Sequence, residues 1–360
     1  MRIALLGTRG IPANYGGFET FAEELSVRLA ERGHQVTVYC REKYSSKCYR
    51  GVHLQYLPTI RHKYFDTVAH TALSTLRVLF QRFDVLLYCN AANAIFTLLP
   101  RVLGMPTVLN VDGLERYRKK WNRIAKTWYL LSEWLATWCC TAVVTDAGRI
   151  QEYYLTRYHK HSTFIPYGAE LGKVHESDAV SALGLQPGRY VLYVSRMEPE
   201  NNALLVRQAF EKVQTDFKLA LIGDAPYSAS YIEEVKRTND PRIVIPGAIY
   251  GDGYHQLQSH CAVYIQATEV GGTHPALIEA MGRGALVLYL KTPESDEVAG
   301  DAAIPFTNDL EQKLQWAVSV PPEERAAWGH RAMQRIEGHY SWKAVTDQYE
   351  AMFRQFTQTA

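Results

Sequence analysis

The sequence predicts an α/β protein with two doubly wound parallel-sheet domains. The chain has 360 residues, which is too long for one ordinary hydrophobic core. Short apolar runs alternate with longer segments of helical period, and the alternation occurs twice along the chain. Because the short runs are apolar throughout, each expected strand should be covered by helices on both faces of its sheet.

The expected strands form two series. The first series is 2–6, 36–40, 52–57, 84–89, 107–111 and 142–145, and the second is 190–195, 219–222, 243–245, 263–265 and 286–290. Gly, Pro and mixed charge without clear periodicity make 167–189 the expected linker. We therefore expect an amino-terminal domain at 1–170, a second domain at 171–340, and a carboxy-terminal helix at 341–360 that packs on either domain.

Composition narrows the classes of function. Hydrophobic residues make up 47% of the chain and charged residues 21%, which is typical of a globular protein rather than a disordered one. With 39 basic and 37 acidic residues, no overall positive charge attracts nucleic acid, and we expect no nucleic-acid partner. The six cysteines have no paired metal spacing, and no run of about 20 apolar residues predicts a membrane span. Without a signal-peptide pattern at the start, we expect a cytoplasmic protein.

Glycines mark the loop after the first expected strand. The loop runs from Gly7 to Gly17, and Gly16 and Gly17 come directly before an amphipathic helical segment. Bare backbone amides at a helix start suit a phosphate or a sugar hydroxyl. The spacing differs from the GxGxxG dinucleotide pattern, and a turn that serves geometry alone is the alternative.

Motifs throughout the chain carry a family resemblance. They are Gly7-Thr8-Arg9-Gly10-Ile11-Pro12, Tyr15-Gly16-Gly17-Phe18-Glu19-Thr20, Gly33-His34-Gln35-Val36, Asn110-Val111-Asp112-Gly113-Leu114-Glu115, Ile165-Pro166-Tyr167-Gly168-Ala169, Ser195-Arg196-Met197-Glu198-Pro199-Glu200-Asn201-Asn202, Ile222-Gly223-Asp224-Ala225 and Glu269-Val270-Gly271-Gly272-Thr273-His274-Pro275-Ala276-Leu277-Ile278-Glu279-Ala280-Met281. Together they resemble the family 4 retaining glycosyltransferases, most of all bacterial rhamnosyltransferases that build surface polysaccharides. The resemblance implies the GT-B fold, in which two Rossmann-like domains face each other across a cleft and the second holds most of the nucleotide.

The resemblance places the donor site mainly in the second domain. Arg196 follows a strand, where a guanidinium can clamp a diphosphate, although a surface salt bridge is the alternative. The family usually has a lysine at the position of Asn201, so one positive charge is missing here. The amides of Gly271, Gly272 and Thr273 precede Pro275, which favours a helix start that points toward the diphosphate.

The helix that begins there carries the expected ribose contact. By resemblance, Glu279 accepts a hydrogen bond from a ribose hydroxyl, whereas a lone helical glutamate is otherwise most often solvated. The family commonly has a second glutamate at the position of Gly271, and Glu269 lies two residues away from it. His274 either helps to hold the sugar or is a partly exposed structural histidine.

Asp112 follows the expected strand 107–111 in the first domain. It either binds the donor sugar, orders the acceptor together with Glu115, or opens a turn before Gly113. We take Asp112, Arg196 and Glu279 as the expected catalytic residues. Donor binding is expected from Gly16, Gly17, Asn201, Gly271, Gly272, Thr273 and His274 in addition to Arg196 and Glu279.

A basic and aromatic segment at 116–126 suggests a membrane or acceptor contact. It has six basic residues and no acid, and we expect Arg118, Lys119, Lys120, Trp121 and Arg123 to contact an anionic membrane surface or the acceptor. The alternative is a basic face whose aromatic residues simply belong to the core. The acceptor contact would include Glu115.

The expected function is transfer of a sugar from a nucleotide donor. By resemblance, the sugar is L-rhamnose from dTDP-rhamnose and the acceptor is a hydroxyl of a lipid-linked saccharide, with retention of configuration, at the inner face of the bacterial plasma membrane. No acidic metal cluster is apparent, so we expect neither a metal nor another cofactor. A nucleotide-sugar epimerase of the same fold and a non-catalytic nucleotide-binding protein remain the alternatives.

Overall fold

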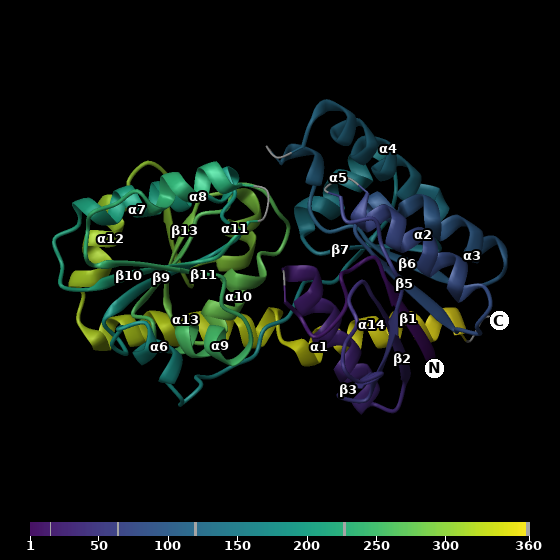
Figure 1. Ribbon diagram of the computed structural model, residues 1–360, viewed down its shortest axis with the longest axis horizontal. Coiled ribbons are helices and arrows are strands. Elements are labelled where there is room, and N and C mark those ends of the chain that lie inside the picture. The colour runs from purple at the N-terminus through teal and green to yellow at the C-terminus, as the bar shows by residue number, and fades with distance from the viewer. Residues whose placement is uncertain (15, 63–64, 119–120, 226–227, 358–360) are drawn as a thin grey trace. The chain divides into compact units, whose positions relative to one another are not determined.

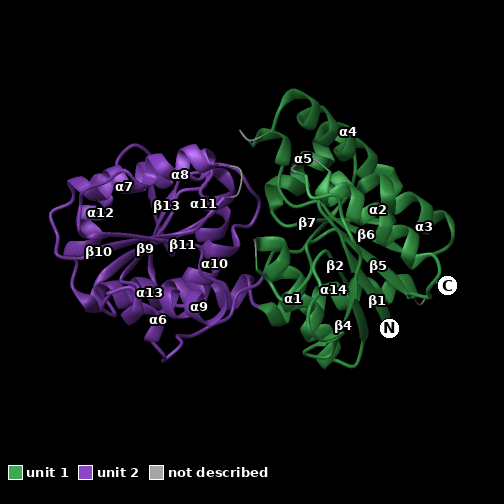
Figure 2. Ribbon diagram, in the orientation of Figure 1, with its two compact units in different colours: residues 1–167, 342–360 green, residues 168–341 purple. Residues whose placement is uncertain are grey.

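The computed structural model describes residues 1–14, 16–62, 65–118, 121–225 and 228–357. The chain forms two compact units, one made of residues 1–167 and 342–360 and the other of residues 168–341 (Figure 2). The expected borders were 170/171 and 340/341, whereas the units divide at 167/168 and 341/342.

Unit 1 is built on an eight-stranded sheet with the order β3-β4-β2-β1-β5-β6-β7-β8. The strands are β1 (Arg2–Leu6), β2 (Gln35–Cys40), β3 (Cys48–Tyr49), β4 (Val52–Tyr56), β5 (Val85–Cys89), β6 (Thr107–Asn110), β7 (Ala142–Thr145) and β8 (Thr163–Phe164). All neighbouring pairs are parallel except β3 with β4. The parallel sheet predicted from the apolar runs is therefore present.

Helices cover both faces of this sheet. They are α1 (Gly17–Glu31), α2 (Asp66–Val78), α3 (Leu98–Val102), α4 (Arg123–Cys139), α5 (Gly148–Tyr158) and α14 (Trp342–Thr357), with 3₁₀ turns η1 (Ala91–Thr97) and η2 (Glu115–Tyr117). The chain first adds β2, β3 and β4 on one side of β1, and then adds β5 to β8 on the other side. Because crossovers between parallel strands are right-handed, this change of direction places α2 to α5 on the face opposite α1. Figure 1 shows α2, α3, α4 and α5 above β5, β6 and β7, whereas α1 and α14 lie lower, near β1 and β2.

The last helix, α14, packs on unit 1, whereas the sequence left open which of the two domains it packs on. One side of α14 buries Trp342, Val345, Tyr349 and Phe353. The ring of Tyr349 lies 5.5 Å from that of Phe21 in α1, and the guanidinium of Arg28 stacks over Trp342. Helix α14 thus closes the apolar face of α1.

Unit 2 is built on a six-stranded parallel sheet with the order β11-β10-β9-β12-β13-β14. The strands are β9 (Tyr190–Val194), β10 (Lys218–Ile222), β11 (Ile243–Gly247), β12 (Val263–Gln266), β13 (Leu286–Leu290) and β14 (Ile304–Phe306). The helices are α6 (Asp178–Ala182), α7 (Ala203–Lys212), α8 (Ala229–Lys236), α9 (Gly251–His260), α10 (Pro275–Gly282), α11 (Pro293–Ala299), α12 (Leu310–Ser319) and α13 (Pro322–His339), with the 3₁₀ turn η3 (Pro199–Asn201).

Two features of the elements were not predicted. The expected linker 167–189 contains helix α6, and the strands β3, β8 and β14 were not expected. These three strands lie at sheet edges and have two or three residues, too few to produce an apolar run. Within the segment 116–126, helix α4 begins at Arg123, because Asn122 accepts a hydrogen bond from the Ala125 amide at 2.9 Å.

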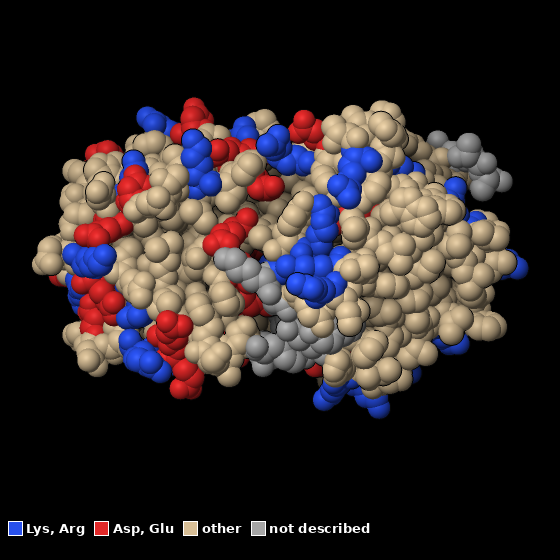
Figure 3. Space-filling view, turned by 90° about the horizontal axis from the view of Figure 1, so that it is seen from above, with Lys and Arg blue, Asp and Glu red and all other residues tan. Residues whose placement is uncertain are grey.

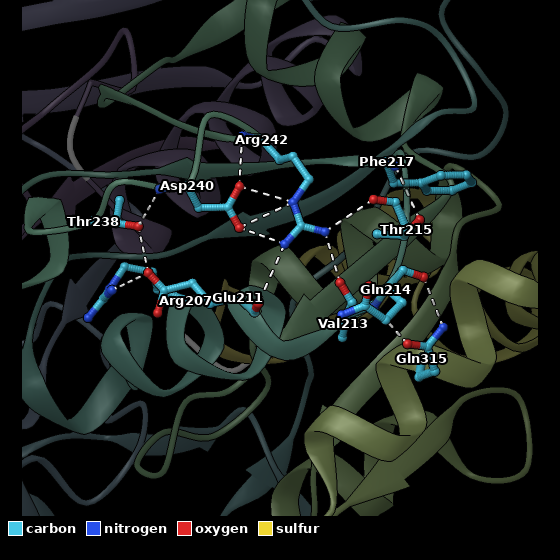
Figure 4. Close-up of polar contacts among 10 residues, drawn as sticks. All are labelled: Arg207, Glu211, Val213, Gln214, Thr215, Phe217, Thr238, Asp240, Arg242 and Gln315. Carbon is cyan, nitrogen blue, oxygen red and sulfur yellow. Dashed lines mark hydrogen bonds and ion pairs between the residues drawn. The ribbon is translucent and has the colours of Figure 1, made fainter.

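A polar cluster closes the amino-terminal edge of the unit 2 sheet (Figure 4). Arg242, directly before β11, bonds both carboxylate oxygens of Asp240 and donates to the carbonyls of Val213 and Thr215, at 2.8 and 3.1 Å. Its guanidinium lies 5.0 Å from the Phe210 ring. Arg242 lowers the pKa of the Asp240 carboxyl through these hydrogen bonds. This cluster therefore fixes the loops that enter the strands, and the carboxyl ends of the strands carry the candidate site.

We predict that Glu350 of α14 makes unit 1 sensitive to acid. It accepts hydrogen bonds from Arg354, from Arg32 at 2.7 Å and from His34 at 3.1 Å, and its pKa falls from 4.5 to about 2. A depressed pKa stabilises the folded state fully above pH 4.5, and this contribution is lost as the pH falls toward about 2. Glu350→Gln should therefore lower the free energy of unfolding by about 1 kcal/mol at neutral pH, and by progressively less in acid.

Urea denaturation at a series of pH values measures this difference. Glu31→Gln, a change at an exposed glutamate of α1, is the matched control and should follow the wild type throughout. A Glu350→Gln deficit that stays constant from neutral pH down to the acid limb would contradict the ion-pair explanation.

Candidate active site

Three adjacent strands of unit 2 end in loops that are joined by backbone hydrogen bonds. The amide of Ser195, after β9, donates to the carbonyl of Ile222 in β10 at 3.1 Å, and the amide of Met197 donates to the carbonyl of Asp224 at 3.3 Å. On the other side, the amide of Glu269, after β12, donates to the carbonyl of Glu200 at 2.9 Å. The loops after β10, β9 and β12 thus form one continuous edge, where ligands of doubly wound sheets bind.

Gly223 lets two of these loops approach closely. Its φ is +151°, and a Cβ at this position would lie 1.8 Å from the Ser195 carbonyl oxygen. Any side chain here would push the loop after β10 away from the loop after β9. Gly223 is therefore required for the shape of this edge.

Arg196 supplies the cation at this edge. Its side chain is 29% exposed, and its Nη1 lies 3.9 Å from Oε2 of Glu198, which is too long for a hydrogen bond. The sequence analysis gave a surface salt bridge as the alternative to diphosphate binding, and this long ion pair agrees with it. The pairing nevertheless leaves the guanidinium partly exposed. A guanidinium held in this way can still bind an anionic oxygen.

Asn201 lies inside the loop that carries Arg196. Its side chain is 2% exposed, and its Nδ2 donates to the Arg196 carbonyl at 2.7 Å. The hydroxyl of Tyr193 donates to the Asn201 carbonyl at 2.6 Å. Asn201, which replaces the lysine usual in the family, therefore shapes the Arg196 loop rather than offering a charge to a donor.

The loop after β12 leads directly into helix α10. The helix begins at Pro275, as predicted, and the buried side chains of Thr273 and His274 precede it. A Cβ at Gly271 would lie 2.6 Å from Cε1 of His274, so a glutamate at this position would strike the imidazole ring. The space usually given to the second family glutamate is thus occupied by His274. The nearby Glu269 accepts a hydrogen bond from Nδ2 of Asn202 at 3.2 Å.

Glu279 of α10 is held by a tyrosine that the sequence did not indicate. The hydroxyl of Tyr254 in α9 donates to Oε2 of Glu279, and Nε2 of Gln258 donates to the same hydroxyl at 2.7 Å. Burial, and then the negative charge of Glu279, raise the pKa of Tyr254 well above its usual value. Tyr254 therefore remains a neutral donor that fixes the glutamate side chain on the inner side of α10.

Glu200 is a second residue that the sequence analysis did not single out. Its side chain is fully buried, and among the described residues neither carboxylate oxygen has a hydrogen-bond partner. No spacing or composition signal distinguishes this glutamate from an exposed one.

Asp112 lies at the corresponding edge of the unit 1 sheet, two residues after the end of β6. Its φ of 56° is left-handed, a conformation that is uncommon for a residue other than glycine. Its amide donates to Oδ1 of Asn110 at 3.1 Å, and Nδ2 of Asn110 donates to the Tyr349 hydroxyl at 2.9 Å. Helix α14 thus fixes the backbone of Asp112 through Asn110.

Asp146, directly after β7, completes an acidic pair with Asp112. A hydrogen bond with Asp146 lowers the pKa of Asp112 and so opposes the effect of burial. Burial first, and then the charge of Glu115, raise the pKa of Asp112. The sequence analysis missed Asp146, although its place after a strand is the same signal that identified Asp112.

The glycine loop after β1 is held by carboxylates of α1. The amide of Arg9 donates to Oε1 of Glu19 at 2.9 Å, and the amide of Ala13 donates to Oε2 of Glu23 at 2.6 Å. Gly16 caps α1 in an extended conformation and Gly17 is its first residue. The predicted helix start is therefore present, with the buried Glu19 in its first turn.

Two arginines of the segment 116–126 pair with carboxylates. Arg116 donates to Glu133 at 2.8 Å, and the buried Arg118 donates to Glu115. Trp121 stacks 5.5 Å from Tyr129 and donates to Glu115 at 3.3 Å. The expected surface contact is wrong for Arg118, because Glu115 draws its guanidinium inward, and Arg116 is drawn inward in the same way by Glu133. Arg123 is exposed, whereas Lys119 and Lys120 lie outside the described residues.

Two absences concern the described part of the chain. His, Cys, Asp and Glu side chains form no group of three or more there that could hold a metal ion. None of the helices in that part is both long enough and apolar enough to cross a bilayer.

Solved structures share the fold of the whole chain. Sucrose-phosphate synthase from Thermosynechococcus elongatus is 18% identical, with a TM-score of 0.80 and all of both chains covered. HepE from Anabaena, in complex with UDP and glucose, is 14% identical with a TM-score of 0.80, covering 99% of this chain and 100% of that one. WaaG, a glycosyltransferase involved in lipopolysaccharide biosynthesis, is 15% identical with a TM-score of 0.73, covering 96% and 99%. No curated protein sequence matches the chain.

Two family models match most of the chain between them. Glycosyltransferase Family 4 matches residues 15–173, and Glycosyl transferases group 1 matches residues 188–319. The order of the two matches follows the order of the two units along the chain. The chain is therefore a glycosyltransferase of the GT-B fold, and it is similar to Glycosyltransferase Family 4 over residues 15–173.

Proposed function

We propose that this glycosyltransferase moves L-rhamnose from dTDP-rhamnose to a hydroxyl of a lipid-linked saccharide, with retention of configuration. The reaction would serve surface-polysaccharide synthesis at the inner face of the bacterial plasma membrane. The proposal rests mainly on the carboxyl edge of the unit 2 sheet, where Arg196, the Gly271–His274 turn and Glu279 belong to loops and a helix around one edge. This arrangement offers a cation, backbone amides and a carboxylate to one nucleotide sugar.

The leaving diphosphate would be stabilised by Arg196 and the helix start. Negative charge develops on the diphosphate as the bond to the sugar breaks, and a guanidinium and amides stabilise that charge. Helix α10 adds the positive end of its dipole next to Gly272 and Thr273. With Asn201 in place of the family lysine, these groups would supply the positive potential.

Glu279 would bind the 3′-hydroxyl of the nucleoside sugar of the donor, which in dTDP is deoxyribose. A carboxylate accepts hydrogen bonds from the hydroxyls of a sugar. The hydrogen bond from Tyr254 keeps the Glu279 carboxylate in one orientation. His274, packed against Gly271, would hold the sugar side of the donor.

Asp112 would act on the unit 1 side, with Asp146 as its partner. With a proton on one member, the pair would both donate to and accept from a sugar hydroxyl. Glu115 contributes a further negative charge near Asp112, which suits a role in orienting the acceptor hydroxyl.

The similar solved structures support the donor class more than the acceptor. The HepE structures contain UDP, or UDP-glucose, or UDP with glucose, and WaaG takes part in lipopolysaccharide biosynthesis. Rhamnose and dTDP rest on the motif resemblance alone.

Product analysis tests the proposal. The protein is incubated with dTDP-rhamnose, with and without a lipid-linked saccharide, and nucleotide and sugar products are followed by mass spectrometry and NMR. Release of dTDP that requires the acceptor, together with an α-linked product from an α-configured donor or a β-linked product from a β-configured one, supports the proposal. Conversion of the donor without acceptor indicates an epimerase, and nucleotide binding without any product indicates a binding protein.

We predict that Glu279 contributes directly to donor affinity. Glu279→Ala removes a charge-assisted hydrogen bond worth about 1.5 to 3 kcal/mol, so dTDP should bind roughly ten- to a hundredfold more weakly. Glu279→Gln should lose less, since an amide oxygen still accepts a hydrogen bond. Tyr254→Phe should lose about threefold, because the carboxylate stays but is no longer fixed.

Calorimetric titration with dTDP measures these affinities, and circular dichroism checks the fold. Glu337→Ala, at an exposed carboxylate of α13, is the control and should bind as the wild type does. Wild-type affinity in a folded Glu279→Ala protein would rule out the ribose contact.

We also predict that the transferase works without a divalent metal ion. Arg196 and the amides before α10 would stabilise the diphosphate in place of a metal. Initial rates in EDTA should stay within about twofold of those with Mg²⁺. Complete loss of activity in EDTA, restored by Mg²⁺ or Mn²⁺, would show that the side-chain cation is insufficient.

A further inference from the structure

Three helices of unit 1 turn large apolar side chains toward solvent. We call these residues the outer apolar face: Leu73, Leu76 and Phe80 of α2 and its end, Leu98, Leu99, Val102 and Leu103 of α3 and its end, and Ile124, Leu130, Leu131, Trp134 and Trp138 of α4. Phe80 is 83% exposed, Ile124 81% and Val102 73%. Single exposed apolar residues are ordinary, but a set on adjacent helices marks an interaction surface.

Helix α2 has the reverse of the usual amphipathic pattern. Leu73, Leu76 and Phe80 follow helical spacing along the exposed side, and the buried side carries His70, Thr71, Ser74 and Thr75. The buried hydroxyls are satisfied locally: Ser74 donates to the His70 carbonyl at 2.8 Å, Thr71 donates to the Thr67 carbonyl at 2.9 Å, and Thr75 bonds the Tyr88 hydroxyl at 3.1 Å. Polar residues inside and leucines outside suit a helix whose outer side also faces an apolar medium.

Helix α4 also turns large apolar side chains outward. Ile124, Leu131, Trp134 and Trp138 lie along its exposed side, and the Trp134 and Trp138 rings meet edge to face at 4.8 Å. Its buried side is mixed, with Tyr129, Ala136 and Cys139 beside Ser132 and Glu133. Two neighbouring helices therefore both present apolar side chains to the outside, and in α2 the buried side is also mostly polar.

The three helices form one surface. Each of α2, α3 and α4 packs against η1, and Arg101 of α3 donates to the Trp138 carbonyl of α4. They lie side by side above the sheet in Figure 1, and the unit 1 part of the view from above in Figure 3 is mostly free of charged side chains.

The charges around the outer apolar face are positive. The three helices contain only two acids, Asp66 and Glu133; Asp66 pairs with Arg41 at 2.9 Å, and Glu133 is buried. Their exposed charged residues are Arg77, Arg101 and Arg123. Arginines beside exposed tryptophans match the headgroup zone of an anionic bilayer. They disfavour a two-fold dimer through this face, because such a dimer would bring the arginines of both copies together.

We propose that the outer apolar face of α2, α3 and α4 docks onto the surface of a bilayer that contains anionic lipids. The apolar side chains would enter the boundary between headgroups and acyl chains, and the arginines would contact lipid phosphates. This surface shares Arg123 and Ile124 with the segment 116–126, whose arginines Arg116 and Arg118 instead pair with Glu133 and Glu115. The inference deepens the proposed function and rests on it for the lipid-linked acceptor, although the docking can be tested without any acceptor.

Vesicle flotation of the full chain tests this proposal. Phosphatidylglycerol vesicles and phosphatidylcholine vesicles are compared at low and high salt. The wild type should float with phosphatidylglycerol more than with phosphatidylcholine, and added salt should reduce that preference. Equal partition to both lipids, or none to either, would overturn the proposal.

Two double variants separate the apolar and the charged contributions. Leu76→Ser with Phe80→Ser should reduce partition by about tenfold on both lipids, because two inserted side chains are lost. Arg101→Gln with Arg123→Gln should reduce it by roughly tenfold on phosphatidylglycerol only. The matched control is Leu171→Ser with Leu205→Ser, two similarly exposed leucines of unit 2, which should partition as the wild type does.

A check of folding and a measurement of the oligomeric state complete the experiment. All changes are at exposed positions, so the circular dichroism spectrum and the dTDP affinity of every variant should match those of the wild type. Sedimentation velocity identifies a dimer: if Leu76→Ser with Phe80→Ser dissociates a dimer and leaves flotation unchanged, a second copy is the occupant and the proposal fails. If the wild type floats as expected but does not bind dTDP, the docking surface stands and the proposed function fails.

Discussion

The direction of the parallel strands is the constraint on which both candidate regions depend. Parallel strands all end at the same edge of their sheet, so a residue that follows one strand lies near residues that follow its neighbours. In unit 2 this brings together the loops after β10, β9 and β12, which backbone hydrogen bonds join into one edge. In unit 1 it places Asp112 and Asp146 beside each other after β6 and β7.

A second layer of polar contacts then orients the side chains at these edges. Tyr254 in α9 donates a hydrogen bond to Glu279. Tyr349 in α14 accepts a hydrogen bond from the side chain of Asn110, and that side chain accepts one from the Asp112 amide. Tyr349 is buried and Tyr254 is half-buried, and desolvation raises the pKa of both, so both hydroxyls stay protonated at physiological pH. Rigid helices behind the loops thus hold groups that loops alone would leave mobile.

The departures from the family pattern have local physical explanations. At the lysine position, Asn201 bonds the carbonyl of Arg196 and so supports the remaining cation. At the glutamate position, the ring of His274 fills the space beside Gly271. The site therefore lacks one cation and one carboxylate relative to the family, and these two changes offset each other in net charge.

The sequence by itself determined the two parallel sheets, the helix start at Pro275 and the places of Asp112, Arg196 and Glu279, because apolar runs, glycines and a proline act on nearby backbone. It could not determine that Arg116 and Arg118 turn inward, since their carboxylate partners are known only once the chain has folded. Nor could it identify Tyr254, which reaches Glu279 from another helix. The outward side of α2 was likewise decided by the tertiary structure: helical spacing shows that its leucines and its hydroxyl residues lie on opposite sides, but only packing against the sheet decides which side meets water.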